Sequence, residues 1–451
     1  MKKEKMKLFI KTFGCQQNVA DSERIVSYYV SRGYTLGKDE KESDLVVINS
    51  CMIRDKAEER VYGYIRNLRK SRSSALLRIV LTGCIVGAAA REPSGKMKKK
   101  LEKRIPDVEL LSIDEVGFEY PPIRQENTSS KGNALEKKKH GWVVISNGCN
   151  NYCAFCIVPF SRGREVSRSY KEIIEEVQDM VAHGYSSVTL LGQNVNSYGS
   201  DLILKGKAQD FESETQDEKS EKRNLETQDH DKKSQDLETR EGYTLFNGKT
   251  VAPVMVKHLG RQRIPTLFPY LLEDIAHIPG IETITFTSSN PWDFSDELIE
   301  VIQRNENIDR LLHLPVQSGS TKILHAMNRW YTKEAYLELL QRIQKRIPEV
   351  KFITDIIVGF PGETEEDFQE TVDLVRQAGF VRAFIACYSE RPGTQATKNM
   401  EDSIPLEEKK RRMRILNEMT NLAHPGVSEG KDWIRTKNKF RFEKEGKERK
   451  E

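Results

Sequence analysis

The chain has 451 residues, enough for two or three domains, with a net charge of +4 and a mean hydropathy of −0.61. No apolar stretch is long enough for a signal peptide or a membrane span, so we expect a cytoplasmic protein with no membrane part. The seven cysteines fit a reducing compartment, and the small net charge means that any contact with a nucleic acid must use local basic patches.

The first part of the chain alternates short apolar runs with amphipathic stretches. Strands are predicted at 7–12, 45–49 and 77–81, with helices at 21–31 and 55–70 between them. This order predicts an α/β domain with a doubly wound parallel sheet, which we assign to residues 1–125.

One cysteine follows each of these three strands, namely Cys15, Cys51 and Cys84. Because the carboxyl ends of parallel strands lie at one edge of the sheet, we expect the three thiols to converge there. Free cysteine is also a common core residue, so three unrelated buried thiols are the alternative. Their equivalent placement in three successive units favours a shared iron–sulfur cluster.

A second series of strands and helices begins at residue 142. Its predicted strands are 142–146, 187–191, 282–287, 310–316, 351–358 and 381–388. Six such units predict a partial (βα)6 barrel over residues 135–420, with its chemistry on the loops that follow the strands. Residues 201–263 interrupt the series with a charged, low-complexity segment, which we expect to be a disordered insert or, alternatively, a charged recognition arm.

Three further cysteines follow the first barrel strand, Cys149, Cys153 and Cys156, with the spacing C-x3-C-x2-C. Three thiolates on one loop can hold three irons of a [4Fe-4S] cluster and leave the fourth iron open to a small molecule. A structural zinc site would need a second close pair of ligands, which the sequence lacks. A catalytic cluster is therefore predicted here, whereas Cys387 is expected to be a core residue.

Several barrel strands end in polar or glycine-rich loops that can bind a small cofactor. Together with the aromatic residue in the cysteine loop, the candidate contacts are Phe155, Gln193, Asn194, Ser288, Gln317, Ser318, Gly359 and Glu363. Glu363 has the alternative role of capping the next helix. Two basic clusters, at 409–414 and at Arg162, Arg164 and Arg168, suit an RNA backbone, although such clusters are often merely solvated.

The chain resembles a known enzyme family on a set of segments spread from residue 7 to residue 420. They include Thr12-Phe13-Gly14-Cys15-Gln16, Gly148-Cys149 through Pro159, Asn290-Pro291-Trp292-Asp293-Phe294, His313 through Ser320, and Met327-Asn328-Arg329-Trp330-Tyr331. On these residues it resembles the radical S-adenosylmethionine (SAM) methylthiotransferases, most closely the tRNA-2-methylthio-N6-dimethylallyladenosine synthase family.

The resemblance implies two [4Fe-4S] clusters and SAM as cofactors. Cys149, Cys153 and Cys156 would hold the cluster that cleaves SAM, and Cys15, Cys51 and Cys84 would hold an auxiliary cluster that supplies or carries sulfur. The implied product is a methylthio group at C2 of N6-isopentenyladenosine at position 37 of tRNA. A flavodoxin or ferredoxin would donate electrons, and we expect a monomer.

Some features depart from the family pattern. The family usually ends in a small β-barrel RNA-binding (TRAM) domain, whereas residues 421–451 are too few for one and are expected to form a vestigial β tail. Two alternatives stay open. One is a methylthiotransferase that acts on threonylcarbamoyladenosine in tRNA or on a ribosomal protein, and the other is a non-catalytic iron–sulfur protein that binds RNA.

Overall fold

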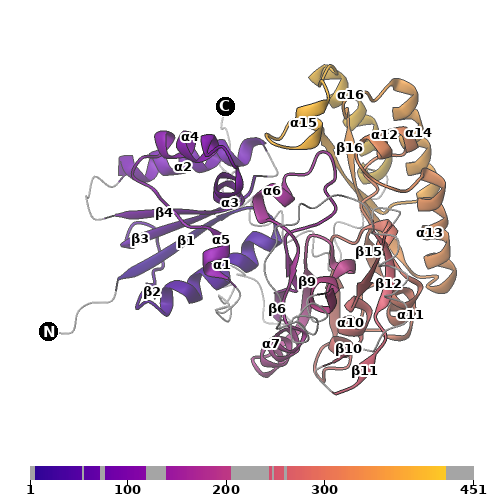
Figure 1. Ribbon diagram of the computed structural model, residues 1–451, viewed down its shortest axis with the longest axis horizontal. Coiled ribbons are helices and arrows are strands. Elements are labelled where there is room, and N and C mark those ends of the chain that lie inside the picture. Colours follow the sequence, from indigo (N-terminus) through magenta and orange to yellow (C-terminus); the bar gives the residue numbers. More distant parts are fainter. Residues whose placement is uncertain are drawn as a thin grey trace, which may run out of the picture.

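The computed structural model forms two lobes that lie side by side, the N-terminal lobe on the left of Figure 1 and the barrel lobe on the right. It describes residues 6–52, 55–71, 77–117, 139–204, 243–245, 248–258 and 262–422. Within these ranges no helix combines the length and the apolar character needed to cross a lipid bilayer.

The N-terminal lobe is a parallel sheet with helices on both faces, as predicted. Its elements are β1 (Lys7–Phe13), α1 (Gln16–Val30), β2 (Thr35–Leu36), β3 (Leu45–Ser50), α2 (Asp55–Ser71), β4 (Arg78–Gly83), α3 (Cys84–Arg91), α4 (Lys96–Arg104), β5 (Glu109–Leu110) and α5 (Ile113–Val116). The strand order is β2-β1-β3-β4-β5. Strand β3 is buried along its whole length, which suits the Leu-Val-Val-Ile run of a strand covered on both faces.

The barrel lobe contains two parallel sheets of three strands each. One has the order β14 (Thr283–Phe286), β9 (Tyr185–Leu191), β6 (Lys139–Val144), and the other has the order β15 (Leu311–His313), β16 (Lys351–Val358), β17 (Arg382–Cys387). An isolated parallel bridge between Ile284 and Ile308 lies where the two sheets meet. The six strands match the predicted series and confirm a partial barrel.

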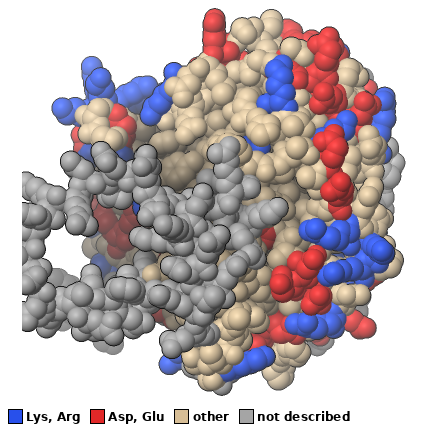
Figure 2. Space-filling view, turned by 45° about the vertical axis from the view of Figure 1, so that its right-hand side comes forward, with Lys and Arg blue, Asp and Glu red and all other residues tan. Residues whose placement is uncertain are grey.

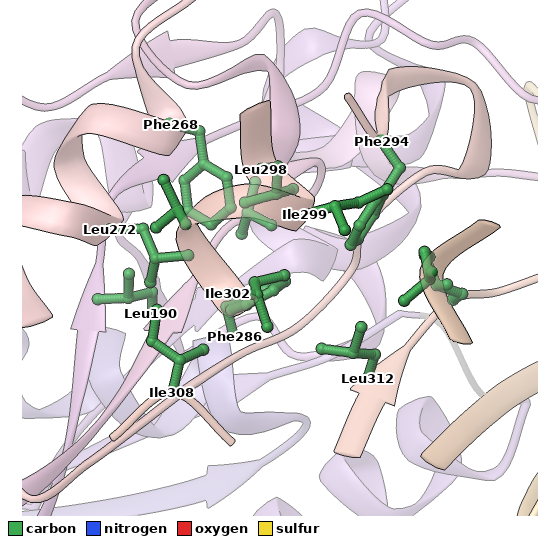
Figure 3. Close-up of a cluster of buried hydrophobic side chains, with 14 of the residues drawn as sticks. Leu190, Phe268, Leu272, Phe286, Phe294, Leu298, Ile299, Ile302, Ile308 and Leu312 are labelled. Atoms are coloured by element: carbon green, nitrogen blue, oxygen red, sulfur yellow. The ribbon is translucent and has the colours of Figure 1, made fainter. Parts of the chain in front are cut away.

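Helices cover the outside of this barrel. The main ones are α7 (Tyr170–Ala182), α10 (Phe268–Ala276), α11 (Asp296–Arg304), α13 (Lys333–Arg346), α14 (Glu365–Ala378) and α16 (Leu406–Asn417). Shorter elements are β7 (Ser146–Asn147), α6 (Val158–Arg162), β8 (Val166–Ser167), η1 (Val195–Ser197), η2 (Pro291–Asp293), α12 (Thr321–Ala326), α15 (Gln395–Asn399) and η3 (Glu418–Leu422). Figure 3 shows the apolar core in which Phe268 and Leu272 of α10 meet Leu190 of β9.

The predicted insert is partly ordered. The strands β10 (Tyr243–Thr244), β11 (Thr250–Val251), β12 (Val254–His258) and β13 (Gln262–Thr266) form two antiparallel hairpins. The prediction of disorder is therefore wrong for residues 201–204, 243–245, 248–258 and 262–263, because 201–204 are helical and Ile203, Val251, Val254 and Val256 are buried. Residues 205–242 lie outside the described residues, as does the predicted tail beyond residue 422.

The two lobes meet through helices α1 and α3. Ala20 of α1 packs against Val144 and Leu191 of the barrel sheet. Helix α3 packs so closely against α6 that a Cβ atom at Gly87 would lie 2.0 Å from the backbone oxygen of Ser161. Arg91 Nη1 also donates to this oxygen at 2.8 Å. As a result, the loop that carries the barrel cysteines is held directly against the N-terminal lobe.

Candidate functional site

The three N-terminal cysteines converge at the carboxyl edge of the first sheet. Cys15 immediately precedes α1, Cys51 follows β3 and Cys84 begins α3. The side chain of Cys51 hydrogen-bonds to Cys15 and Cys84, and these two hydrogen bonds, with burial, raise the pKa of the Cys51 thiol. Residues separated by up to 69 positions are thus in mutual contact, as the parallel topology requires.

The turn that precedes Cys84 requires a glycine. Gly83 has φ +89°, and a Cβ atom there would lie 2.3 Å from the backbone oxygen of Ser50. A residue with a side chain would be strained and would collide with the end of β3. Gly83 therefore lets β4 turn into α3 beside Cys51.

The three barrel cysteines lie on the loop after β6 and are held by backbone hydrogen bonds. Cys149 N donates to Gly163 O at 3.2 Å, and Cys156 N donates to Cys153 O at 2.9 Å. Burial raises the pKa of Cys156 to about 12, and the charges of Cys153 and, to a smaller extent, Cys84 add to this rise. Ile157, the residue after Cys156, packs in the same buried cluster as Cys84, so the two sets of cysteines lie close together.

A buried arginine accompanies the barrel cysteines. Arg329 is 3% exposed, and its Nη1 donates to Cys153 Sγ at 3.6 Å while its Nη2 donates to Pro315 O at 2.7 Å. Its guanidinium also lies 4.8 Å from the centre of the Trp292 ring. A buried cation stabilises a thiolate beside it. Sequence reasoning assigned no role to Arg329, although its position in a run of aromatic residues was a usable signal.

Two candidate cofactor contacts adopt left-handed backbone conformations that side chains rarely take. Ser288 has φ 66° and Gln317 has φ 72°. Ser288 N donates to His313 Nδ1 at 3.3 Å, and His313 Nε2 lies 2.7 Å from Asp355 Oδ2. Such conformations cost energy and are retained most often at functional sites.

Asn194 belongs to a buried polar group at the end of β9. Its Nδ2 donates to Asp293 Oδ2 at 2.6 Å, while the second oxygen of Asp293 and Oδ1 of Asn194 have no hydrogen-bond partner in the described part of the chain. Nearby, Glu165 accepts from Ser197 Oγ at 2.7 Å, and burial raises the pKa of Glu165 to about 8. Buried acceptors of this kind suit a polar ligand that donates hydrogen bonds.

Other candidate contacts serve the scaffold. Glu363 Oε2 accepts from Gly359 N and from Arg412 Nη1, both at 2.6 Å, so this oxygen ties the glycine-rich loop to α16. Thr364, and not Glu363, caps α14. Ser318 is fully buried and its Oγ accepts from Ser320 N.

Two candidates remain without a defined polar role. Phe155 packs against an apolar cluster that includes Met327 and Phe360. Gln193 is half-buried. Neither residue has a geometry that by itself identifies a cofactor contact.

The cysteine sets suit clusters better than single ions. Across the described ranges, no three His, Cys, Asp or Glu side chains are arranged to hold one metal ion. A cubane cluster binds each thiolate to a different iron, so the three sulfur atoms need not converge on one point. The orphaned buried oxygens of Asn194 and Asp293 additionally suit an amino group such as that of SAM.

Much of the predicted RNA-binding strip is engaged within the protein. Arg162 pairs with Asp21 at 2.7 Å, and Arg168 with Glu176 at 2.6 Å. In the second cluster, the two buried members, Lys409 and Arg412, also form ion pairs. These four residues are therefore not available to a phosphate backbone, and that part of the hypothesis is wrong. Figure 2 shows acidic and basic side chains interleaved on the face presented.

Comparison with known proteins places this site in a family. The model described as "Uncharacterized protein family UPF0004" matches residues 7–109, and the model of the radical SAM superfamily matches residues 143–233 and 262–375. The tRNA-2-methylthio-N(6)-dimethylallyladenosine synthase of Thermotoga petrophila is 38% identical over 428 residues, covering 91% of this chain and 81% of the relative. The chain belongs to this synthase family.

Further members of the family support the assignment. The synthase of Carboxydothermus hydrogenoformans is 39% identical, with 92% of this chain and 83% of the relative covered. That of Staphylococcus haemolyticus is 37% identical, with 90% and 70% covered. Membership of this radical SAM family gives SAM and [4Fe-4S] clusters as cofactors, as the resemblance implied.

One solved structure shares the fold. The radical SAM methyltransferase TsrM from Kitasatospora setae, with cobalamin and a [4Fe-4S] cluster bound, aligns with a TM-score of 0.50 and 11% identity. The alignment covers 87% of this chain and 77% of that one. It supports a shared α/β architecture of the two lobes.

Proposed function

We propose that the chain transfers a methylthio group to C2 of the adenine in N6-isopentenyladenosine at position 37 of tRNA, with SAM as methyl donor and radical source. The observation that carries the proposal is the convergence of two sets of three cysteines, one from each lobe. Cys84 and Ile157, the residue after Cys156, belong to one buried apolar cluster, which supports the proximity of the two sets. Family membership supplies the reaction type.

We assign the two cysteine sets different tasks. Cys149, Cys153 and Cys156 would hold the cluster that binds SAM, and Cys15, Cys51 and Cys84 would hold the auxiliary cluster. When bound, these cofactors supply the radical that removes the C2 hydrogen and the sulfur that replaces it, chemistry that acid–base groups cannot perform on an aromatic C–H bond.

The surrounding residues would bind and orient. Arg329 would offset the negative charge of the Cys153 thiolate. The free oxygens of Asn194 and Asp293 would accept hydrogen bonds from the amino group of SAM, while Ser288 and Gln317 would present backbone groups from the strand ends. The burial of Asn194, Asp293 and Gln317 would exclude water, which protects a radical from side reactions.

The tRNA backbone would need a basic surface other than the strip that is engaged in ion pairs. Lys99, Lys100 and Lys103 of α4 are exposed and have no ion pair with any residue that the structure describes. The first turn of α4 contains Lys96 and Lys98 but no acidic residue, which is unfavourable for the helix dipole. Exposed lysines concentrated on one helix suit a phosphate partner.

We also propose a domain division, an electron donor, an oligomeric state and a location. The N-terminal domain would comprise residues 1–125 and the radical SAM domain residues 135–420. A flavodoxin or ferredoxin would supply electrons to a monomeric enzyme in the cytoplasm.

Mass spectrometry of tRNA tests the proposal directly. A deletion strain should lose 2-methylthio-N6-isopentenyladenosine and accumulate N6-isopentenyladenosine, and the wild-type gene, but not a Cys153→Ala variant, should restore the product. Unchanged levels in the deletion strain would refute the proposed substrate. Loss of a methylthiolated threonylcarbamoyladenosine instead would identify the related tRNA activity.

A reconstituted sample separates an enzyme from a non-catalytic iron–sulfur protein. After anaerobic loading with iron, sulfide, SAM and a reductant, the wild-type chain should release 5′-deoxyadenosine and contain about eight iron atoms, the content of two cubane clusters. Failure to release 5′-deoxyadenosine at full iron content would favour a protein that only binds RNA.

A further inference from the structure

Arg162 is a buried charge at the contact between the two lobes. It ends α6, directly after the barrel cysteine loop, and is 4% exposed. Its Nη2 lies 2.7 Å from Asp21 Oδ2 of α1, and its Nη1 donates to Asn147 Oδ1 at 3.0 Å. An ion pair that joins positions 141 residues apart within the interior is expensive to desolvate, so its retention calls for a reason other than stability alone.

The same guanidinium adjoins the auxiliary cysteines. Its partner Asp21 lies on α1, which begins directly after Cys15, and Ser161, the residue before Arg162, packs against Gly87, one helical turn after Cys84. The Arg162 charge also interacts with Cys15. A charged residue of the barrel lobe therefore lies close to the cysteines of the N-terminal lobe.

The helix that carries Arg162 has little freedom to move away. Gly87 on α3 leaves no room for a side chain against Ser161, the residue before Arg162. Arg91, one turn after Gly87 on the same helix, donates from Nη1 to the Ser161 oxygen, and a Cβ atom at Gly163 would lie 2.9 Å from Arg91 Nε. Since α3 begins at Cys84, the packing of α3 against α6 fixes the position of Arg162 relative to Cys84.

We propose that Arg162 is a positioning residue for the auxiliary cluster: it holds a positive charge beside Cys84 and Cys15 from the opposite lobe, fixes that cluster relative to the SAM-binding cluster and raises its reduction potential. Hydrogen bonds to sulfur and nearby positive charge favour the reduced, more negative state of an iron–sulfur cluster. Asp21 opposes this effect because its carboxylate offsets the charge of Arg162. The inference rests on the proposed assignment of Cys15, Cys51 and Cys84 to that cluster.

The test measures the auxiliary cluster alone. In the full-length chain, Cys149, Cys153 and Cys156 are replaced by alanine, the protein is reconstituted anaerobically, and the potential of the remaining cluster is determined by titration monitored by electron paramagnetic resonance. Arg162→Gln should make the potential more negative, and Asp21→Asn should make it less negative. Arg162→Lys should leave it near the parent value.

The opposite signs separate an electrostatic role from a structural one. Both Arg162→Gln and Asp21→Asn break the same ion pair, so a residue that only joined the lobes would give shifts of the same sign or none, which would overturn the inference. If Arg162→Gln fails to retain iron, Asp21→Asn and Arg162→Lys decide, and an unchanged potential in Asp21→Asn would overturn it. A parent protein that binds no cluster would instead refute the cluster assignment on which the inference rests.

Discussion

The contact between α3 and α6 can be tested by replacing a single glycine. Gly87 lies inside α3, where alanine would normally stabilise a helix by about 0.5–1 kcal/mol. At this position the new Cβ atom would lie 2.0 Å from the Ser161 oxygen, a backbone atom that cannot rotate away. Overpacking of this kind costs about 1–3 kcal/mol. We therefore expect Gly87→Ala to destabilise the protein by about 1 kcal/mol net.

Gly63 of α2 provides a matched control. It is also helical, but a Cβ atom there would meet only the far end of Arg66 at 4.0 Å, so Gly63→Ala should stabilise the protein by about 0.5–1 kcal/mol. The two variants should differ by about 2 kcal/mol, roughly a 30-fold difference in the unfolding equilibrium. Urea denaturation under anaerobic conditions measures this difference. Equal stabilisation by both alanines would show that α3 and α6 are not in contact and would refute the reasoning.

Three further perturbations give distinct outcomes. In the folded state the pKa of Glu165 is about 8, against an ordinary value of 4.5, so the folded state binds more protons between these pH values and the free energy of unfolding falls as pH rises across them. Thermal melts at several pH values should show a smaller fall in the melting temperature for Glu165→Gln than for the wild type. Parallel curves would contradict the burial argument. Arg412→Met leaves a buried carboxylate without its partner and should cost about 3–5 kcal/mol in chemical denaturation, whereas a loss below 1 kcal/mol would mean that the pair is exposed. Replacing Lys99, Lys100 and Lys103 by alanine should weaken tRNA binding and lower the slope of log affinity against log salt by about 3 if each meets a phosphate, and an unchanged slope would exclude α4 from the interface.

The sequence predicted the strands well because each is a short apolar run bounded by polar or glycine residues. Position 45–49 is such a run, and the observed strand is Leu45–Ser50. Helix α1 was predicted from residue 21 but begins at Gln16, because its first turn is polar and buried and carries no apolar periodicity. Asn18 in that turn donates from Nδ2 to Asn49 Oδ1 at 3.1 Å, a tertiary contact that a pattern of hydrophobicity cannot reveal.

The convergence of the cysteines could be anticipated, whereas the partners of the charged residues could not. Parallel topology alone brings Cys15, Cys51 and Cys84 to one edge. The burial of Arg162 against Asp21 depends on how two lobes dock, and nothing local in the sequence distinguishes it from the exposed Arg164. For the same reason, the ordered hairpins within the expected insert were missed, since their few valines matter only once the barrel provides a surface to cover.

The close packing at Gly87 also constrains how halves of such enzymes can be recombined. A chimera that takes its first half from one homologue and its second half from another would be cut most naturally within 118–138, the stretch between the last described residue of the first lobe and the start of β6. Such a cut separates Gly87 from Ser161 and Asp21 from Arg162, although the two members of each pair are in direct contact. Successful exchanges should therefore carry both members of each pair from the same parent.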